Sequence, residues 1–424
     1  MPRTHLGIKH QRGESRPSLT SLRVSIAQKC ILGITFAVCS PSKNSLAFEH
    51  RDVSGELHWT SPSLQGAAGI GAMAESWVDQ AQTDVSLLAR RRATFEMELA
   101  GFSGLVSRDA VNTVVDTVNT LTTQSNSSAG SSSAAQSTIS ALNKVRSVFG
   151  KSMTLQTQAA FVAPRIGRVG IAPYMSGSVD ASIDNAAWPT IDSYGGVYAG
   201  ALVSYAQTIQ KDFDLGVALR PGVGGYRGFQ LGVSMLGDFM GSSSSGSSGS
   251  NGNSTSDLFQ FPTAVYCPLD VAIGWWMNNS TRFHAVSKNT FDAAPLNNLS
   301  GSAGRLQSRI NLGVVQDIPL PESKSQSLLL AGELQDFAGI KGGWNEMLLR
   351  LQVAGRYEVR LPFREQTTFA VNVGLHSGYP VASLFLDLFL AKLEIALSAR
   401  ENGGYAGQRP NRLMSAKVYS QMQF

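Results

Sequence analysis

The sequence has few residues whose types and spacing could carry out catalysis or bind a metal. The histidines beyond the amino-terminal region, His50, His58, His284 and His376, have no second histidine or cysteine at metal-ligand spacing. No Gly-x-Ser-x-Gly elbow, phosphate loop or dinucleotide fingerprint is present. We therefore expect no catalytic site, no metal and no cofactor. Ser, His and Asp can meet on barrel strands without a local motif, so a lipid hydrolase stays as the least favoured alternative.

The best candidates for binding are polar side chains that alternate with apolar ones in the last hundred residues. If these segments are strands of a membrane barrel, the charged positions must face the lumen, because each costs about 2–4 kcal/mol on the lipid side near the midplane. The alternative is that they only pair across strands or fill the lumen. The candidate ligand pathway consists of Arg350, Gln352, Arg356, Glu358, Arg360, Asn372, Asp387, Glu394 and Arg400.

Amphipathic strands are the elements that must position these side chains. Residues 349–361 alternate strictly, which predicts one strand of about 13 residues, long enough to cross a bilayer at a tilt. The same alternation continues at 369–375, 384–390 and 393–399, with a tight turn expected near Ala391 and Lys392. The alternative of one helix over 381–397 would place Asp387, Lys392 and Glu394 in a bilayer, at a few kcal/mol each. Strands are therefore favoured.

Earlier segments alternate less regularly and predict further strands at 94–101, 153–163, 169–181, 196–208, 213–220 and 229–236. With the less certain region 258–316, the fold class is all-β, a transmembrane antiparallel β-barrel of about 14 strands. Aromatic residues near segment ends predict girdles at the two membrane interfaces. These residues are Tyr198, Tyr205, Trp275, Trp276 and Trp344.

Composition and charge agree with a barrel and argue against nucleic-acid binding. Charged residues make up 15% of the chain, against roughly 25% in ordinary soluble domains. The apolar residues do not form runs of about 18, which a helical membrane protein would need. The net charge is +5, but residues 1–47 alone carry +6, which leaves −1 for the rest. We therefore expect no nucleic-acid partner.

Residues 1–47 are predicted to be a signal peptide that is cleaved after Ala47. Basic Arg23 and Lys29 precede the apolar segment 30–39, and Ser45-Leu46-Ala47 supplies a small-residue cleavage site. A lipoprotein signal at Cys39 is the alternative, but Val38 before it suits the processing enzyme poorly. Cleavage after Ala47 would leave Cys267 as the one thiol, so no internal disulfide is expected.

Two serine-rich tracts, 124–138 and 242–256, interrupt the strand pattern. Such compositions bury too little apolar surface to become ordered, so both are expected to be mobile loops. Valines at helical spacing around the first tract predict a small helical insertion over 105–150, and the second tract predicts a Ser/Gly-rich loop over 240–257.

The carboxyl-terminal strand resembles the sorting signal of outer-membrane barrels, through Val418, Met422 and the final Phe424. This resemblance implies the barrel-assembly machinery as a partner. Together with the predicted signal peptide, it places the protein in the bacterial outer membrane.

The whole pattern resembles the outer-membrane family of long-chain fatty-acid transporters, with its relatives among conjugal-transfer and secretion-associated barrels. The resemblance rests on the Gly-rich stretch 66–71, the strand pair 197–220 before Pro221, and the run Gly-Tyr-Ala-Gly-Gln-Arg-Pro at 404–410. It implies a barrel over 93–424 plugged by an amino-terminal hatch over 48–92, which releases a hydrophobic ligand through a lateral opening.

We therefore predict a monomeric transporter in contact with membrane lipid. It would take up long-chain fatty acids, or other hydrophobic or small nutrients, by diffusion. The alternative is a non-transporting barrel that acts as an assembly or surface-interaction protein.

Overall fold

The computed structural model describes residues 61–91, 93–108, 152–183, 190–232, 263–290, 297–298, 308–320, 325–340, 344–360, 368–388, 391–401 and 410–423. The predicted signal peptide, the first part of the predicted hatch, the serine-rich insertion from residue 109 on, the Ser/Gly-rich loop and Phe424 lie outside these residues.

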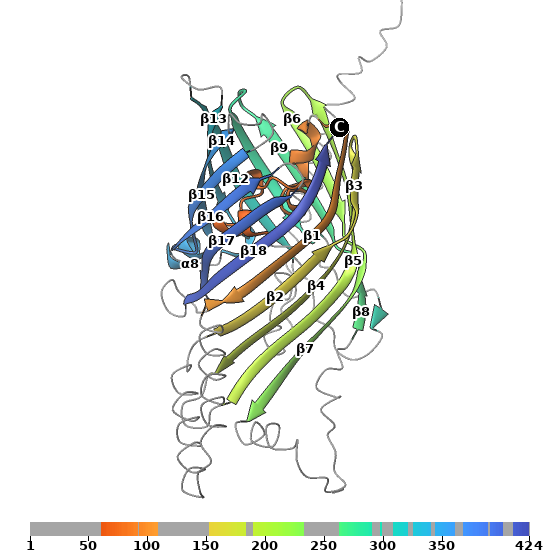
Figure 1. Ribbon diagram of the computed structural model, residues 1–424, viewed down its shortest axis with the longest axis vertical. Coiled ribbons are helices and arrows are strands. Elements are labelled where there is room, and N and C mark those ends of the chain that lie inside the picture. The colour runs from red at the N-terminus through yellow and green to blue at the C-terminus, as the bar shows by residue number, and fades with distance from the viewer. Residues whose placement is uncertain are drawn as a thin grey trace, which may run out of the picture. The chain divides into compact units, whose positions relative to one another are not determined.

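All strands in the described residues belong to one antiparallel sheet, and its first and last members, β1 and β18, pair with each other (Figure 1). The sheet therefore closes into a barrel without free edges. The strands are β1 (Phe95–Ser107), β2 (Ser152–Ala160), β3 (Ala163–Ile166), β4 (Val169–Ile183), β5 (Thr190–Gln210), β6 (Phe213–Leu219), β7 (Gly222–Gly232), β8 (Thr263–Tyr266), β9 (Leu269–Trp276), β10 (Thr281–Lys288), β11 (Asn297–Asn298), β12 (Arg309–Pro319), β13 (Gln326–Leu334), β14 (Leu351–Arg360), β15 (Thr368–His376), β16 (Tyr379–Asp387), β17 (Lys392–Glu401) and β18 (Pro410–Gln423).

These 18 segments make 14 barrel strands, because four strands are interrupted. β2 and β3 share the neighbours β1 and β4, and β6 and β7 share β5. β8 and β9 form the third interrupted strand, and β10 and β11 form the fourth. Two interruptions fall at Pro221 and Pro268, where proline cannot donate to the ladder. The expected strand number is confirmed.

Several predicted boundaries move. β14 begins at Leu351 rather than at residue 349, because helix α8 (Trp344–Arg350) precedes it. β1 continues to Ser107, so an insertion cannot start at residue 105. β7 begins at Gly222, earlier than the strand predicted at 229–236. Two strands do replace the alternative helix over 381–397, joined by a turn in which the Leu388 amide donates to the Ala391 carbonyl at 2.9 Å.

The two rims of the barrel differ in the length of their connections. On the short-turn rim, which also holds the start of β1 and the end of β18, consecutive strands are separated by few residues in the sequence, as at 167–168, 211–212, 277–280 and 388–391. At the opposite, long-connection rim, consecutive strands are separated by longer stretches of sequence, among them 108–151, 233–262, 335–350 and 402–409. Its exception is the turn at Ser377 and Gly378, whose φ angles of 52° and 81° are those of a tight hairpin.

Side chains alternate between the lumen and the outside along each strand. In β14, Gln352 and Arg356 are buried on the lumen side, whereas Leu351, Val353 and Tyr357 are exposed outward. Outward positions elsewhere are also mostly apolar. Examples are Phe102, Ile171, Met175, Leu312, Leu330, Val373, Leu384, Ile395, Leu397, Met414 and Val418.

The aromatic prediction holds only in part. Trp275 is exposed outward near the short-turn rim and stacks on Phe213 and Phe283, and Tyr205 is also exposed. Tyr198, in contrast, points into the lumen, where it is 2% exposed and its hydroxyl donates to the Arg220 carbonyl at 2.7 Å. A girdle role for Tyr198 is therefore wrong, because the register of β5 puts it on the inner face.

Residues 61–91, called the hatch below, lie inside the barrel (Figure 1). They contain α2 (Pro62–Gly66), η2 (Gly71–Met73), α3 (Trp77–Thr83) and η3 (Val85–Arg90). The Ser76 hydroxyl caps α3 by accepting from the Val78 amide at 3.1 Å. One buried cluster joins Trp77, Val78 and Val85 to small wall residues, and a second joins Ile70 and Met73 to the wall.

None of the helices in the described segments is long and apolar enough to cross a membrane.

Candidate ligand-binding site

Ion pairs connect the hatch to the barrel wall around its circumference. Asp79 binds Lys417 of β18 at 2.9 Å, Asp84 binds Arg282 of β10 at 2.8 Å, and Arg90 binds Asp214 of β6 at 2.7 Å. Glu75 pairs with Arg356 of β14, whose guanidinium also donates to the Met73 carbonyl at 3.0 Å. Breaking one buried pair leaves a charge without compensation, so these contacts hold the hatch in one place.

The pair of Asp79 and Lys417 belongs to a fully buried group that is rich in carboxyls. The Lys417 ammonium is also 3.5 Å from Glu98 of β1, which accepts from the Ser76 hydroxyl at 2.5 Å. Burial raises the pKa of Asp79 to about 7; Lys417 acts to lower this pKa, whereas Glu394 and Glu98 raise it further. Asp79 therefore holds its proton far more readily than an ordinary aspartate.

The other two hatch carboxyls shift in the opposite direction. Burial alone would raise the pKa of Glu75, but Arg356, Lys392 and Arg91 outweigh burial and leave it below its usual value. The pKa of Asp84 is likewise lowered, because Arg282 and the Ser86 hydroxyl outweigh its burial. Both groups are therefore anchors that stay ionised at neutral pH.

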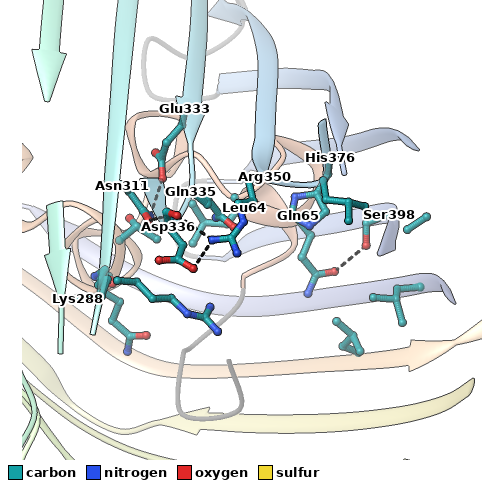
Figure 2. A pocket seen from close by; sticks show the side chains of 18 of the residues that line it. Leu64, Gln65, Lys288, Asn311, Glu333, Gln335, Asp336, Arg350, His376 and Ser398 are labelled. Atoms are coloured by element: carbon teal, nitrogen blue, oxygen red, sulfur yellow. Dashed lines mark hydrogen bonds and ion pairs between the residues drawn. The ribbon is translucent and has the colours of Figure 1, made fainter. Parts of the chain in front are cut away.

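A cavity of about 510 Å³ lies between the hatch and the strand ends at the long-connection rim. This volume falls within the roughly 300–1,000 Å³ of small-molecule sites. Figure 2 shows Gln65 and Ser398 on one side of the cavity, and Glu333, Asn311 and Asp336 on another. The apolar part of the lining consists of Leu64, Leu105, Leu349, Ala399 and Leu413.

The charged side of the cavity comes from β12, β13 and the connection that follows β13. Glu333 accepts from the Asn311 amide at 2.8 Å and lies 3.2 Å from the His284 ring. Arg350 pairs with Asp336 and, at 3.1 Å, with Glu346. The charges at the cavity therefore already have partners within the protein.

The predicted pathway residues divide into two groups. Gln352, Arg356, Asn372 and Glu394 are all buried on the lumen side, as the alternation predicts. Asn372 donates to the Ser383 hydroxyl at 2.9 Å. These four residues lie at hatch level; they do not line the cavity. Their role in a ligand pathway stays a prediction.

The remaining predicted residues lie near the rims. Glu358 pairs with Arg356 at 3.3 Å, and Asp387 pairs with Lys392 at 3.0 Å beside the turn. Arg360 is exposed at the end of β14. The prediction that Arg350 faces the lumen from a strand is wrong, because it ends α8; it does line the cavity.

The Arg400 backbone belongs to β17, but its side chain lies outside the described ones.

Sequence reasoning did not find the residues that line the cavity most directly. Asn311 stands at an alternating position between Ile310 and Leu312, a signal that could have indicated it. Glu333 follows the run Leu328, Leu329, Leu330, which hides the alternation of β13. Gln65 lies in the hatch, where no periodicity relates it to the wall.

Among the described residues, no group of three or more His, Cys, Asp and Glu side chains could hold a metal ion.

No family model and no curated protein matches this chain. Among solved structures, it is similar to a "TodX deltaS2S3 mutant monoaromatic hydrocarbon channel" at 9% identity and a TM-score of 0.49, over 87% of this chain and 100% of that one. The toluene transporter TbuX of Ralstonia pickettii gives 10% identity and 0.43, over 89% and 100%. The P. putida toluene transporter TodX gives 9% and 0.46, over 87% and 99%. At this level of similarity, the fold rests on the strand pairing of the chain itself.

Proposed function

We propose that this chain is a bacterial outer-membrane barrel that takes up small hydrophobic or amphipathic molecules, with long-chain fatty acids as the first candidates, by diffusion. The observation that carries the proposal is the cavity between the hatch and the long-connection rim. A hatch tied to the wall would restrict general diffusion through the lumen, whereas the cavity has room for one bound molecule. That combination favours selective uptake over an open pore.

The outward surface supports a place in a membrane. Most described outward side chains in the strands are apolar, and a closed barrel satisfies its backbone hydrogen bonds internally, as hydrocarbon requires. In outer-membrane barrels the short turns face the periplasm and the longer loops face outside. By this rule the cavity would open toward the cell exterior, where nutrients arrive.

The terminal strand supports assembly by the barrel-assembly machinery. Val418 is exposed outward and Met422 occupies the same parity, so the sorting pattern that ends in Phe424 would face lipid. We propose that the folded protein acts as a monomer, since closure leaves no strand edge for a second copy.

A lateral exit would fit best beside β1. Pairing of β1 changes from β3 at Glu98 to β2 at Gly101, and Phe161 and Val162 separate β2 from β3. The β1–β18 register also shifts between Glu98 and Gly101. We propose this interruption of the wall as the release route toward the membrane.

Uptake of a radiolabelled long-chain fatty acid by cells that express the full chain tests the proposal. Leu105→Trp should fill the cavity and reduce saturable uptake, whereas Phe102→Trp, on the outward face of the same strand, should leave it unchanged. Absence of saturable uptake from correctly folded barrels would favour the interaction protein. Hydrolysis of ester lipids would favour the enzyme.

A further inference from the structure

The lining of the cavity is too polar for a site that binds plain hydrocarbons, and its polar groups indicate the chemistry of the ligand. It combines leucine side chains with carboxamides, carboxylates and guanidinium groups in one space (Figure 2). Ionised carboxylates only accept hydrogen bonds, guanidinium groups only donate, and carboxamides do both. A ligand that fits all three must offer donors and acceptors together at one end.

The charges in the lining are close to balanced before any ligand arrives. Arg350 pairs with Asp336 and Glu346, and Lys288 lies 3.1 Å from Asp270. Arg309 interacts electrostatically with Asp336. An anionic ligand would have to compete with these carboxylates, and a cationic ligand with the guanidinium groups. The lining therefore favours a neutral polar group.

Gln65 supplies a donor that the described part of the fold does not use. Its Oε1 accepts from the Ser398 hydroxyl at 3.4 Å, while its buried Nε2 has no hydrogen-bond partner among the described residues. Burying a donor that has no hydrogen-bond partner costs free energy, because no protein contact replaces its lost hydration. An oxygen of a bound molecule would satisfy it, and the nearby Leu64 offers an apolar surface for the rest of that molecule.

From this lining we infer that the cavity selects a neutral amphipathic molecule whose polar end carries two or more hydroxyl groups. A hydroxyl both donates and accepts, so each hydroxyl of such a ligand can pair with either kind of polar group in the lining. The inference rests on the proposed uptake function and, within its ligand class, prefers neutral polyhydroxylated amphipaths to long-chain fatty acids, which are anions. Plain hydrocarbons would leave Gln65 unsatisfied, and such a site rejects analogues that lack the polar group.

Three probes with the same hexylbenzene body test the inference on the full chain in lipid nanodiscs, by isothermal titration calorimetry. Hexylresorcinol carries two hydroxyls, hexylbenzoate carries an anion, and hexylbenzene carries neither. We expect hexylresorcinol to bind about tenfold or more tightly than the other two, which corresponds to one buried polar group left unsatisfied.

Variants of Gln65 separate recognition from folding. Gln65→Leu and Gln65→Met, which both remove the Nε2 donor, should each weaken hexylresorcinol about tenfold and leave hexylbenzene unchanged. Gln207→Leu, at the short-turn rim, should change neither.

Equal binding of all three probes, or tightest binding of hexylbenzoate, would overturn this inference and leave the proposed function intact. Failure of every probe to bind, together with absent fatty-acid uptake, would overturn both.

Discussion

At the scale of single residues, the contacts that matter most are buried charges shared by the hatch and the wall. Asp79, Glu98 and Lys417 are all fully buried, with two carboxyls close to one ammonium. Such groups are costly to remove from water, and their balance depends on protonation. Both predictions at this scale therefore concern the anchorage of the hatch.

The first prediction is a pH dependence that originates at Asp79. Its folded pKa of about 7 lies above the ordinary value of 3.8, so the folded state holds a proton that the unfolded chain releases. Its favourable contribution is therefore complete below about pH 4 and is lost as the pH rises toward 7. Urea unfolding between pH 5 and 7.5 measures this effect. The free energy of unfolding should decrease more steeply with rising pH for the native chain than for Asp79→Asn.

The other two hatch carboxyls, Glu75 and Asp84, do not titrate between pH 5 and 7.5. The lowered pKa values of Glu75 and Asp84 give stability that is present above their ordinary values of 4.5 and 3.8 and is lost only at more acidic pH. Equal slopes for Asp79→Asn and the native chain would show that Asp79 is ionised throughout.

The second prediction is that Lys417→Met destabilises the protein by about 3–5 kcal/mol, because Asp79 and Glu98 lose their buried counterion. Removing the carboxyl as well, in Lys417→Met with Asp79→Leu, should restore much of the loss. Urea unfolding in lipid vesicles measures both changes. As a control, Lys211→Met, at an exposed turn, should change stability by less than about 0.5 kcal/mol. If Lys417→Met changed stability no more than this control does, the anchoring role would be contradicted.

At the scale of elements, the hatch fits the wall because glycines leave room for it. A Cβ atom on Gly170 of β4 would overlap the Trp77 ring, and one on Gly216 of β6 would overlap the backbone at Val85. Trp77 also belongs to the same buried cluster as Ala160 and Ala163, which lie on either side of the interrupted wall beside β1. Helix α3 therefore takes part in the packing behind the proposed release route.

A larger residue at Gly170 should loosen this contact. Gly170→Val is expected to cost about 1–3 kcal/mol through overpacking, and to move Trp77 into a more polar environment. A red shift of tryptophan fluorescence and faster proteolysis of the hatch are the measurements. Gly104→Val is the matched control, because nothing lies within 4 Å of its added Cβ. Equal behaviour of the two variants would mean that Trp77 does not depend on Gly170.

At the scale of the whole molecule, closure gives the described strands an inner side that faces the lumen or the hatch and an outer side that is mostly apolar. Val373 of β15 is 56% exposed on the outer face, whereas its neighbour Asn372 is fully buried inside. If that outer face contacts lipid, Val373→Arg should destabilise the barrel by about 2–4 kcal/mol in bilayers. Unfolding in vesicles tests this, with Val373→Leu as the neutral control. Equal stability of both variants would remove the lipid-facing assignment.

Local alternation was sufficient to predict most of the strands and the faces of the most regular ones. Residues two apart in a strand lie on the same side whatever the strand pairs with, so the lumen positions of Arg356 and Asn372 followed from parity alone. The same rule separated two strands from a helix over 381–397, and the number of such segments indicated about 14 strands.

The tertiary structure alone decided what occupies the lumen and where a ligand has room. Gln65 and Ser398, or Asp79 and Lys417, are more than 300 positions apart, and no periodicity relates a hatch residue to a wall residue. Their contacts exist only once the sheet has closed and the hatch has docked at the glycine positions. The start of β14 was likewise decided by its neighbours, since α8 takes the first two residues of the alternation predicted over 349–361. The two-residue periodicity of the sequence identifies which face of a strand a residue occupies, but long-range packing determines what that residue contacts.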